Sequence, residues 1–279
     1  SSLYTLATDS LQSGAKYVLA KVDQQTAQLE FLGSANAAGD VLPDCLSIDS
    51  ATKRAVYCSI DFSLGEECLA VLDLISGRLV QKQCFQRLVV DNVAWQQGSE
   101  NIFFNAYNET TSTNNIYLWD LNAKSIRAVV SEKGNLIKVG INTFSNSLKL
   151  FFLAVQYDCA SAGLCNRLLT IDVEKMTVAS RVDVKPDIEI LVFDDNKRKL
   201  YAWCADQQIA AELIELNWKT GAVGTPLMSS KVFSANGGSS AIDQSTGTIV
   251  ASLLNMQQSN QPYFFKSNLY ATHPSHSLI

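Results

Sequence analysis

The segment from Pro186 to Val223 reads PDIEILVFDDNKRKLYAWCADQQIAAELIELNWKTGAV. An apolar run is followed by the polar turn 194–198, and a second apolar run spans Leu200–Trp203. A loop then leads to a third, largely apolar run at Leu213–Leu216, and the Thr220–Gly221 turn precedes a fourth. Short apolar runs separated by polar turns are typical of β-strands. The segment therefore predicts one antiparallel sheet of four strands.

The same pattern recurs along the whole chain. Apolar strands that end in Asp or Asn occur at Val18–Asp23, Leu69–Asp73, Ile116–Asp120, Leu168–Asp172, Leu213–Asn217 and, in degenerate form, Tyr263–Asn268. The closing residues are 50, 47, 52, 45 and 51 positions apart. A second marker has a similar period. It is an apolar residue followed by a polar one, a few residues before another β-rich run, and it occurs at Ile48–Asp49, Trp95–Gln96, Phe144–Ser145, Phe193–Asp194 and Ile242–Asp243.

A period near fifty, four strands in each repeat and no helical periodicity are typical of β-propeller blades. We therefore predict an all-β fold, a six-bladed β-propeller of four-stranded antiparallel blades that forms a single domain over residues 1–279. The chain is expected to enter part-way through a blade, because Leu3–Ala7, Tyr17–Val22 and Leu29–Leu32 read as second, third and fourth strands. Ring closure would then use the tail, with Leu269–Thr272 or Ser277–Ile279 completing the blade begun at the N-terminus.

The repeated order of apolar pair, Asp, turn, Leu-Tyr, loop, apolar strand, Asp and Thr-Gly resembles the six-bladed propeller superfamilies, such as the YWTD, NHL and gluconolactonase-like groups. The resemblance covers nearly the whole chain and is architectural. The sequence has no Tyr-Trp-Thr-Asp or Asn-His-Leu box, and Asp9–Gln12 stands where a gluconolactonase-like enzyme would offer an acidic metal motif. The resemblance implies the fold, and it assigns no function to any residue.

The composition argues against two classes of protein. Among the 279 residues, 22 are Lys or Arg and 27 are Asp or Glu, so the net charge is −5. The densest basic patch, Lys197–Lys199, is too small for a nucleic-acid footprint. The most apolar stretches, such as Leu148–Val155, are much shorter than the roughly 20 residues of a membrane-spanning helix. We predict neither nucleic-acid binding nor a membrane span.

Four of the seven cysteines fall on successive predicted strands of the second blade, at Cys45, Cys58, Cys68 and Cys84. Each intervening turn is centred on the midpoint between two consecutive cysteines, so all four thiols are expected on one face of the sheet. Directly opposed residues are within disulfide range. We predict the bonds Cys45–Cys58 and Cys68–Cys84. A single Cys58–Cys68 bond, or four free buried thiols, are the alternatives.

The remaining cysteines and one sequon bear on the compartment. Cys159 and Cys165 bracket a Ser- and Gly-containing loop and are predicted to bond, whereas Cys204 is expected to be buried and inert. Asn108-Glu109-Thr110 is an N-glycosylation sequon. Together with the absence of an initial Met, these features favour a secreted or extracellular/luminal protein.

Candidate metal ligands come from the innermost strands. Both histidines, His273 and His276, lie in the tail, so histidine chemistry is not expected in the blades. The residues expected at the channel mouth are Asp44, Asp91, Asn92, Lys138, Asp187, Glu189 and Asn236. Oxygens of Asp44, Asp91, Asn92, Asp187 and Asn236 would suit Ca²⁺, which takes six to eight oxygen ligands. The competing interpretation is that these groups are simply hydrated, with Lys138 neutralising one carboxylate.

Other recurrent residues are expected to be structural. Asp at a turn entrance accepts backbone N–H groups, and this role is predicted for Asp23, Asp49, Asp73, Asp120, Asp172, Asp194 and Asp243. The pairs Phe103–Phe104, Phe151–Phe152 and Phe264–Phe265 are expected in the core between blades. Trp218, in a turn, is expected to be the most exposed of the four tryptophans.

Two functions from different classes are compatible with these residues. The first is a secreted recognition or scaffold propeller that binds a protein or glycan through the loops 105–115, 156–166 and 255–262 on one rim. The second is an enzyme acting on a small-molecule ligand at the channel mouth. It would be either a Ca²⁺-dependent, lactonase-like hydrolase or an acid–base catalyst built on Glu189, a carboxylate among apolar strand residues. Whether the protein is an enzyme stays open at this point.

Overall fold

The computed structural model describes residues 3–8, 17–23, 26, 28–31, 40–61, 63–132, 136–158, 164–205, 211–255, 261–270 and 276–278. The regular elements of these residues are all β-strands. The described residues contain no helix with the length and hydropathy needed to cross a membrane. The chain divides into two compact units, Ser1–Lys133 and Gly134–Ile279.

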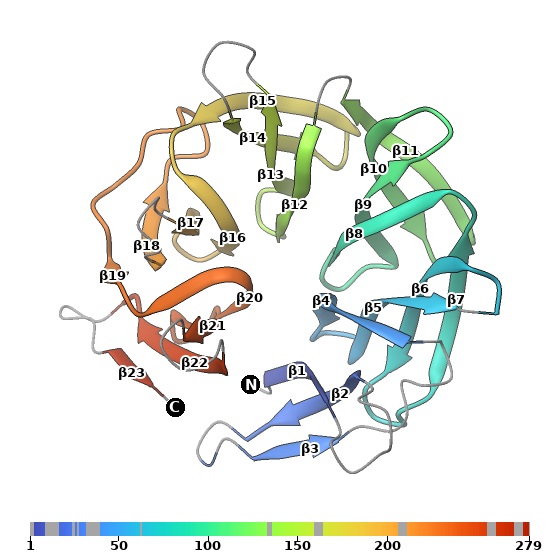
Figure 1. Cartoon of the computed structure of the whole chain (residues 1–279), viewed down its shortest axis with the longest axis horizontal. Coiled ribbons are helices and arrows are strands. Elements are labelled where there is room, and N and C mark those ends of the chain that lie inside the picture. The colour runs from blue at the N-terminus through green and yellow to red at the C-terminus, as the bar shows by residue number, and fades with distance from the viewer. Residues whose placement is uncertain are drawn as a thin grey trace. The chain divides into compact units, whose positions relative to one another are not determined.

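The first unit contains three antiparallel sheets whose strands lie side by side in sequence order (Figure 1). The three-stranded sheet consists of β1 (Leu3–Thr8), β2 (Tyr17–Val22) and β3 (Leu29–Phe31). The two four-stranded sheets consist of β4 (Asp40–Asp49), β5 (Arg54–Asp61), β6 (Glu66–Asp73) and β7 (Leu79–Phe85), and of β8 (Leu88–Trp95), β9 (Asn101–Asn108), β10 (Thr113–Asp120) and β11 (Ser125–Glu132).

The second unit contains three four-stranded antiparallel sheets, again in sequence order. The first consists of β12 (Leu136–Ser145), β13 (Leu150–Asp158), β14 (Leu164–Asp172) and β15 (Thr177–Val184). The second consists of β16 (Asp187–Asp194), β17 (Lys199–Ala205), β18 (Ala211–Leu216) and β19 (Met228–Ser230). The third consists of β20 (Phe233–Asp243), β21 (Thr248–Asn255), β22 (Gln261–Asn268) and β23 (His276–Leu278).

The prediction of six four-stranded blades is wrong, because the described strands form five four-stranded sheets and one three-stranded sheet. The three N-terminal strands are found where they were expected. The tail, however, does not complete their sheet, since β23 pairs with β22. A short antiparallel return to the preceding strand needs no crossover, which explains why the tail strand is used locally.

Both faces of the sheet β16–β19 are covered by neighbouring sheets of the second unit. On one face Phe193 stacks against Phe152 of β13, with ring centroids 5.0 Å apart. On the other face Trp203 packs edge-on against Phe265 of β22 at 5.4 Å. The whole run Ile190–Phe193 is consequently buried. Burial on both faces accounts for a continuous apolar run in place of strict alternation.

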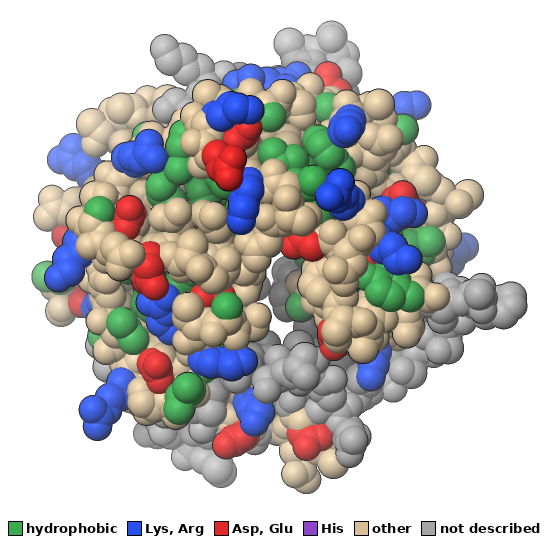
Figure 2. Space-filling view, turned by 180° about the vertical axis from the view of Figure 1, so that it is seen from behind, with side chains coloured by type: hydrophobic (Ala, Val, Ile, Leu, Met, Phe, Trp, Pro, Cys, Tyr) green, Lys and Arg blue, Asp and Glu red, His purple; other side chains and the backbone are tan. Residues whose placement is uncertain are grey.

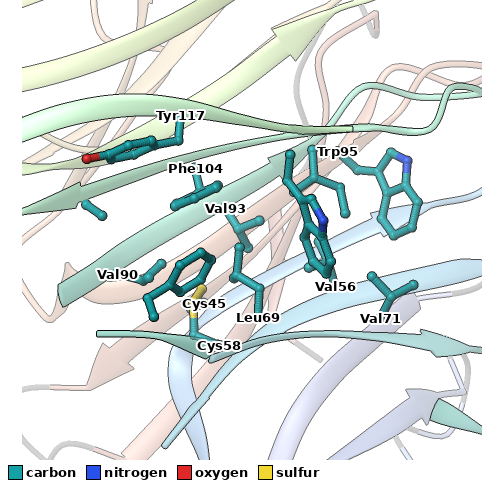
Figure 3. Close-up of a cluster of buried hydrophobic side chains, with 14 of the residues drawn as sticks. Cys45, Val56, Cys58, Leu69, Val71, Val90, Val93, Trp95, Phe104 and Tyr117 are labelled. Atoms are coloured by element: carbon teal, nitrogen blue, oxygen red, sulfur yellow. A yellow bond between two sulfur atoms is a disulfide. The ribbon is translucent and has the colours of Figure 1, made fainter. Parts of the chain in front are cut away.

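The first unit has an equivalent core between the sheets β4–β7 and β8–β11 (Figure 3). Within it, the rings of Phe104 and Tyr117 stack with centroids 5.1 Å apart. Both members of the pair Phe103–Phe104 are fully buried, as are both members of Phe151–Phe152 in the second unit. These two pairs therefore belong to the core, as predicted. In the third pair Phe265 is buried, and the side chain of Phe264 lies outside the described residues. Trp218 is the only one of the four tryptophans that is not fully buried.

Both disulfides predicted for the second blade are present. Cys45 bonds to Cys58 with Cα atoms 5.3 Å apart, and Cys68 bonds to Cys84 with Cα atoms 3.9 Å apart. In Figure 3 the Cys45–Cys58 bond lies beside Val90 at one side of the core cluster. Cys165 is also disulfide-bonded. Its predicted partner, Cys159, lies outside the described residues.

The prediction that all four thiols share one face is wrong. In the β5–β6 pair Cys58 lies opposite Leu69, and Ser59 lies opposite Cys68. The register therefore differs by one residue from the predicted one, and a shift of one residue moves a side chain to the other face. The cause is the length of the β5–β6 turn. Asp61 pairs with Glu66, so the turn contains an even number of residues, whereas the prediction assumed an odd number centred on residue 63. The two disulfides consequently lie on opposite faces of the sheet.

The recurrent turn residues act as predicted. Asp73 is representative, because its Oδ1 accepts the N–H groups of Ile75 at 3.0 Å and Ser76 at 2.6 Å. Equivalent bonds are made by Asp23, Asp49, Asp120, Asp172, Asp194, Asn217 and Asp243. Each carboxylate or amide oxygen satisfies N–H groups that the turn would otherwise leave without partners.

A glutamine clamp joins neighbouring sheets within each unit. Gln97 donates from Nε2 to the carbonyl of Ile48 at 2.5 Å and accepts the N–H of Ser50 at Oε1, 3.1 Å away. In the second unit Gln244 does the same, donating to the Phe193 carbonyl at 2.8 Å and accepting the Asp195 N–H at 2.9 Å. The two residues occupy equivalent positions in the repeat. One amide side chain thus holds the turn of the preceding sheet at both a donor and an acceptor.

We predict that Gln244→Ala lowers the free energy of unfolding by about 1–3 kcal/mol, since it removes two hydrogen bonds worth roughly 0.5–1.5 kcal/mol apiece. Gln97→Ala should lower it by at least as much, because it also removes the hydrogen bond from the Ser50 hydroxyl at 3.3 Å. Urea denaturation measures the loss. Gln81→Ala is the control, because Gln81 is half-buried on β7 and makes no side-chain hydrogen bond within the described part of the chain. Equal losses in Gln81→Ala and Gln97→Ala would refute a specific role for the clamp.

A second prediction concerns acid stability. The Lys82 ammonium holds the pKa of Asp61 at about 2, the Ser76 N–H lowers the pKa of Asp73, and Lys175 lowers that of Asp172. A folded-state pKa below the unfolded value stabilises the fold above roughly pH 4, and this contribution is lost as the pH falls through the folded value. The melting temperature should therefore decrease between about pH 5 and pH 2.

Asp73→Asn separates charge from hydrogen bonding, because the amide oxygen can still accept the Ile75 and Ser76 N–H groups. Thermal unfolding followed by circular dichroism should show a smaller acid-dependent fall for Asp73→Asn than for the wild type. Asp73→Ala should be less stable at every pH, since it loses the acceptor. An acid-dependent fall in Asp73→Asn as large as that of the wild type would contradict the assignment.

Candidate functional site

The first strand of every four-stranded sheet carries an irregularity near its start. In β8 the pairing passes from Val90 to Asn92 and leaves Asp91 out, and in β16 it passes from Ile188 to Ile190 and leaves out Glu189. Comparable shifts occur in β4, β12 and β20. β-Bulges change the direction of a side chain and are frequent beside active sites. The residues predicted at the channel mouth therefore fall at or beside these irregularities.

The candidates are distributed over both units. Asp91 and Asn92 belong to the first unit, and Asp187 and Glu189 belong to the second. The side chains of Asp44, Lys138 and Asn236 lie outside the described part of the structure, although their backbones lie in β4, β12 and β20.

In the first unit the exposed Asp91 accepts a hydrogen bond from Nδ2 of Asn105 across the β8–β9 pair, at 3.4 Å. The side-chain oxygen of Asn92 accepts the N–H of Val93 at 2.7 Å, so it is already engaged by the backbone. Ca²⁺ needs six to eight oxygens. The described candidates of this unit supply only part of such a shell.

Beside Asp91, two large side chains are exposed. Val89 and Tyr107 lie directly opposite each other in the β8–β9 pair and expose 41% and 38% of their surface. Asn105, which binds Asp91, lies two residues from Tyr107 on the same strand and therefore on the same face. We refer to Val89, Asp91 and Tyr107 as the β8–β9 patch. It combines an aromatic ring, a branched aliphatic group and a carboxylate at one end of the sheet.

Glu67 of the neighbouring sheet supports the start of β8. Its Oε2 accepts the N–H of Val90 at 2.5 Å, immediately before the bulged Asp91. Burial raises the pKa of Glu67, the Val90 N–H opposes that shift, and the charge of Glu109 adds to it. Glu67 thus positions the bulge that carries the patch.

In the second unit the polar group is more enclosed. Glu189 is only 8% exposed, and Asp187 accepts a hydrogen bond from Nε2 of Gln156 at 3.3 Å. Burial, together with the charges of Glu212, Asp187 and Glu189, raises the pKa of the Cys204 thiol to about 12. A thiol that stays protonated is a poor nucleophile. Cys204 is thus free, buried and inert, as predicted.

One further group of potential metal ligands exists among the described residues. The carboxylate of Asp61 and the sulfurs of Cys68 and Cys84 lie within 4.8 Å of one another. The two sulfurs are bonded to each other, and Asp61 pairs with Lys82 at 2.8 Å. These partners already occupy the donor atoms, so the group is structural.

The predicted rim loops are shorter than expected where the structure describes them. The segment 105–115 is mostly strand, since β9 ends at Asn108 and β10 begins at Thr113. Tyr107 therefore lies in strand β9 and not in the predicted loop. The other two loops contain residues 159–163 and 256–260, which lie outside the described residues.

Charged side chains of both signs lie on the surface of the described residues. Figure 2 shows basic and acidic side chains interspersed over the described part of this face, without a continuous basic stripe. Among the described residues several charges are paired, such as Arg54 with Glu100 at 2.5 Å and Lys199 with Glu215 at 2.6 Å.

No protein-family model and no curated protein sequence matches the chain. Several solved structures, however, are similar to the chain in fold. TolB from Acinetobacter baumannii has a TM-score of 0.68 at 13% identity, with 99% of this chain covering 63% of that one. This chain thus spans less than two thirds of the TolB chain.

Two further structures are similar over most of their own length. A chain of a nidogen/laminin complex has a TM-score of 0.64 at 10% identity, covering 96% of this chain and 90% of that one. A putative 6-phosphogluconolactonase from Bacteroides uniformis has a TM-score of 0.60 at 12% identity, covering 99% and 80%. At such identities the likeness concerns the fold alone. The chain has an all-β, propeller-type fold built from four-stranded antiparallel blades.

Proposed function

We propose that this protein is an extracellular recognition module that binds a protein or glycan through the end of the sheet β8–β9 where the β8–β9 patch lies. The observation that carries the proposal is the exposed cross-strand pair Val89–Tyr107 beside the bulged Asp91. Most other large apolar side chains of these strands are buried in the core. Val89 and Tyr107 are instead exposed beside the hydrogen-bonded carboxylate of Asp91, and such a combination of apolar and polar groups can bind a partner.

The chemistry of the patch favours recognition. Tyrosine provides a large apolar surface with few rotatable bonds and a polar tip, and it is enriched where protein surfaces meet partners. Asp91 adds an acceptor whose direction is set by the bulge and by Asn105. The support from Glu67 and Asn105 means that little ordering is required on binding, which reduces the entropic cost of association.

Two further observations support this proposal. Disulfides such as Cys45–Cys58 and Cys68–Cys84 persist mainly in oxidising compartments, which agrees with a secreted or luminal location. One of the similar structures comes from a nidogen/laminin complex, so a similar fold takes part in a protein complex there. The second argument is an analogy of fold and carries less weight than the patch itself.

The proposal predicts that Tyr107→Ala weakens ligand binding by about tenfold or more, as expected for an aromatic residue at the centre of an interface. Arrays of extracellular proteins and of glycans, probed with the wild type, identify the ligand class, and titration measures the change in Kd. Ile75→Ala is the control, because Ile75 is 82% exposed in the same unit but at the other end of its sheet. Binding that Ile75→Ala reduces as much as Tyr107→Ala would refute the patch.

The second candidate is a Ca²⁺-dependent, lactonase-like hydrolase or an acid–base enzyme that uses Asp91, Asp187 or Glu189. The bulges at Asp91 and Glu189 favour it, because such irregularities aim polar side chains. The likeness to a putative 6-phosphogluconolactonase adds an analogy of fold. One observation argues against a calcium site. Oδ1 of Asn92 accepts the N–H of Val93, so this oxygen of the predicted ligand set is already hydrogen-bonded.

This alternative predicts that adding Ca²⁺ to EDTA-treated protein raises the melting temperature, because a ligand that binds only the folded state stabilises it. Asp91→Asn should reduce the rise, since it removes a charge while keeping the shape of the side chain. Differential scanning fluorimetry with Mg²⁺ as the control ion measures the effect. A melting temperature that does not respond to Ca²⁺ would exclude calcium at these residues.

A further inference from the structure

Asn108-Glu109-Thr110 is the single Asn-x-Ser/Thr triplet in the sequence, and it lies at the β9–β10 turn. Oδ1 of Asn108 accepts the N–H groups of Thr110 at 2.9 Å and Thr111 at 3.3 Å. Asn108 is half-buried at the end of its strand, and the four residues that follow it are exposed. Within the described part of the chain, its Nδ2 donates no hydrogen bond. The acceptor atom of the amide is thus occupied, and its nitrogen is available.

The sheet β4–β7 has a comparable turn 47 residues earlier, of which Phe62 lies outside the described residues. Asp61 occupies the position of Asn108, and its Oδ1 accepts the N–H of Ser63 at 3.1 Å. Both turns have four residues between paired strand ends, and each ends with a residue in the left-handed region, Gly65 at φ 65° and Ser112 at φ 50°. The turn therefore needs a side-chain oxygen at its first position, which aspartate supplies as well as asparagine. The amide nitrogen of Asn108 is not required by the turn.

From this comparison we propose that Asn108 is an N-linked glycosylation site. Nδ2 attacks the anomeric carbon of a sugar donor that is activated as a lipid-linked diphosphate. The new bond joins nitrogen to carbon, the bond from the anomeric carbon to the diphosphate oxygen breaks, and the diphosphate leaves with the electron pair. The amide loses one proton to a base of the transferase. Disulfides such as Cys45–Cys58 persist mainly in oxidising compartments, and the secretory lumen, where such donors are used, is one of these.

The folded turn accommodates the product. The neighbours Glu109, Thr110, Thr111 and Ser112 are exposed, so a glycan at this hairpin extends into solvent. Side chains alternate between faces along a strand, so Asn108 and Tyr107 point to opposite faces of the sheet. A glycan on Asn108 consequently leaves the β8–β9 patch open. The inference does not depend on the proposed ligand.

The test is to produce the full chain behind a secretion signal in a eukaryotic cell line and to treat the secreted protein with peptide N-glycosidase. The wild type should show a single mobility shift, and mass spectrometry should find residue 108 converted to aspartate with ¹⁸O from labelled water. N108D is the matched control, because it keeps the turn oxygen, as Asp61 does, but removes the acceptor nitrogen. It should be secreted without a shift and melt close to the deglycosylated wild type.

A gain-of-site variant tests the shared geometry. D61N places a second sequon, with Ser63 at its third position, in the equivalent turn, so it should add a second mobility step. Wild-type protein that is secreted without any shift, or a shift that persists in N108D, would overturn the assignment. A D61N protein with one step only would refute the claim that this turn geometry suffices. Ligand binding by Tyr107→Ala is a separate measurement, so either proposal can fail alone.

Discussion

Burial of both faces of a sheet is the constraint on which the rest of this structure depends. A four-stranded sheet has two apolar faces, and packing against one neighbour covers only one of them. In the second unit the sheet β16–β19 is covered on one side through Phe152 and on the other through Phe265. This explains why Ile190–Phe193 is apolar at every position and why repeats of nearly fifty residues can share so little sequence. What each repeat must keep is an apolar strand of the right length and a turn that brings the next strand back.

The turns meet the second requirement with hydrogen bonds that tolerate variation. An Asp or Asn at the entrance accepts N–H groups of its own turn, and Gln97 or Gln244 reaches the turn of the preceding sheet. These bonds need an oxygen or an amide at one position, and the residues between can change. The pattern was therefore readable in the sequence even though no family box is present.

The strands, the turn aspartates, the core aromatics and both disulfides of the second blade followed from periodicity and from residue spacing. Other features did not, and two of them show why. Cys58 and Cys68 were assigned to one face because the loop between them was taken as symmetric, whereas pairing of Asp61 with Glu66 gives an even-numbered turn. The tail was assigned to the N-terminal sheet, whereas β23 pairs locally with β22. Loop parity and the choice of a strand partner depend on atomic packing that hydropathy does not encode.

In the candidate site, too, the sequence pattern predicted which residues are polar but not the local backbone geometry. Asp91 and Glu189 could be singled out as polar residues at the start of innermost strands. Their position at bulges could not, because a bulge adds a residue to one strand without any compositional signal. Tyr107 was missed for a related reason, since four polar or small residues around it, Asn105, Ala106, Asn108 and Glu109, resemble a loop.

In each four-stranded sheet the recurrent polar turns lie at one end and the bulges of the first strand lie at the other. The recurrent Asp and Asn turns of the four-stranded sheets follow the first or the third strand, which end on the same side of an antiparallel sheet, and the glutamine clamps lie on that side too. The bulges, the β8–β9 patch and Asn108 lie at the opposite end, where the first strand begins and the second ends. Because the hydrogen bonds of the clamped end do not involve the bulged end, we expect substitutions of exposed residues at the bulged end to cost little stability. A recognition surface and a glycan acceptor can therefore occupy that end together, each on its own face of the β8–β9 pair.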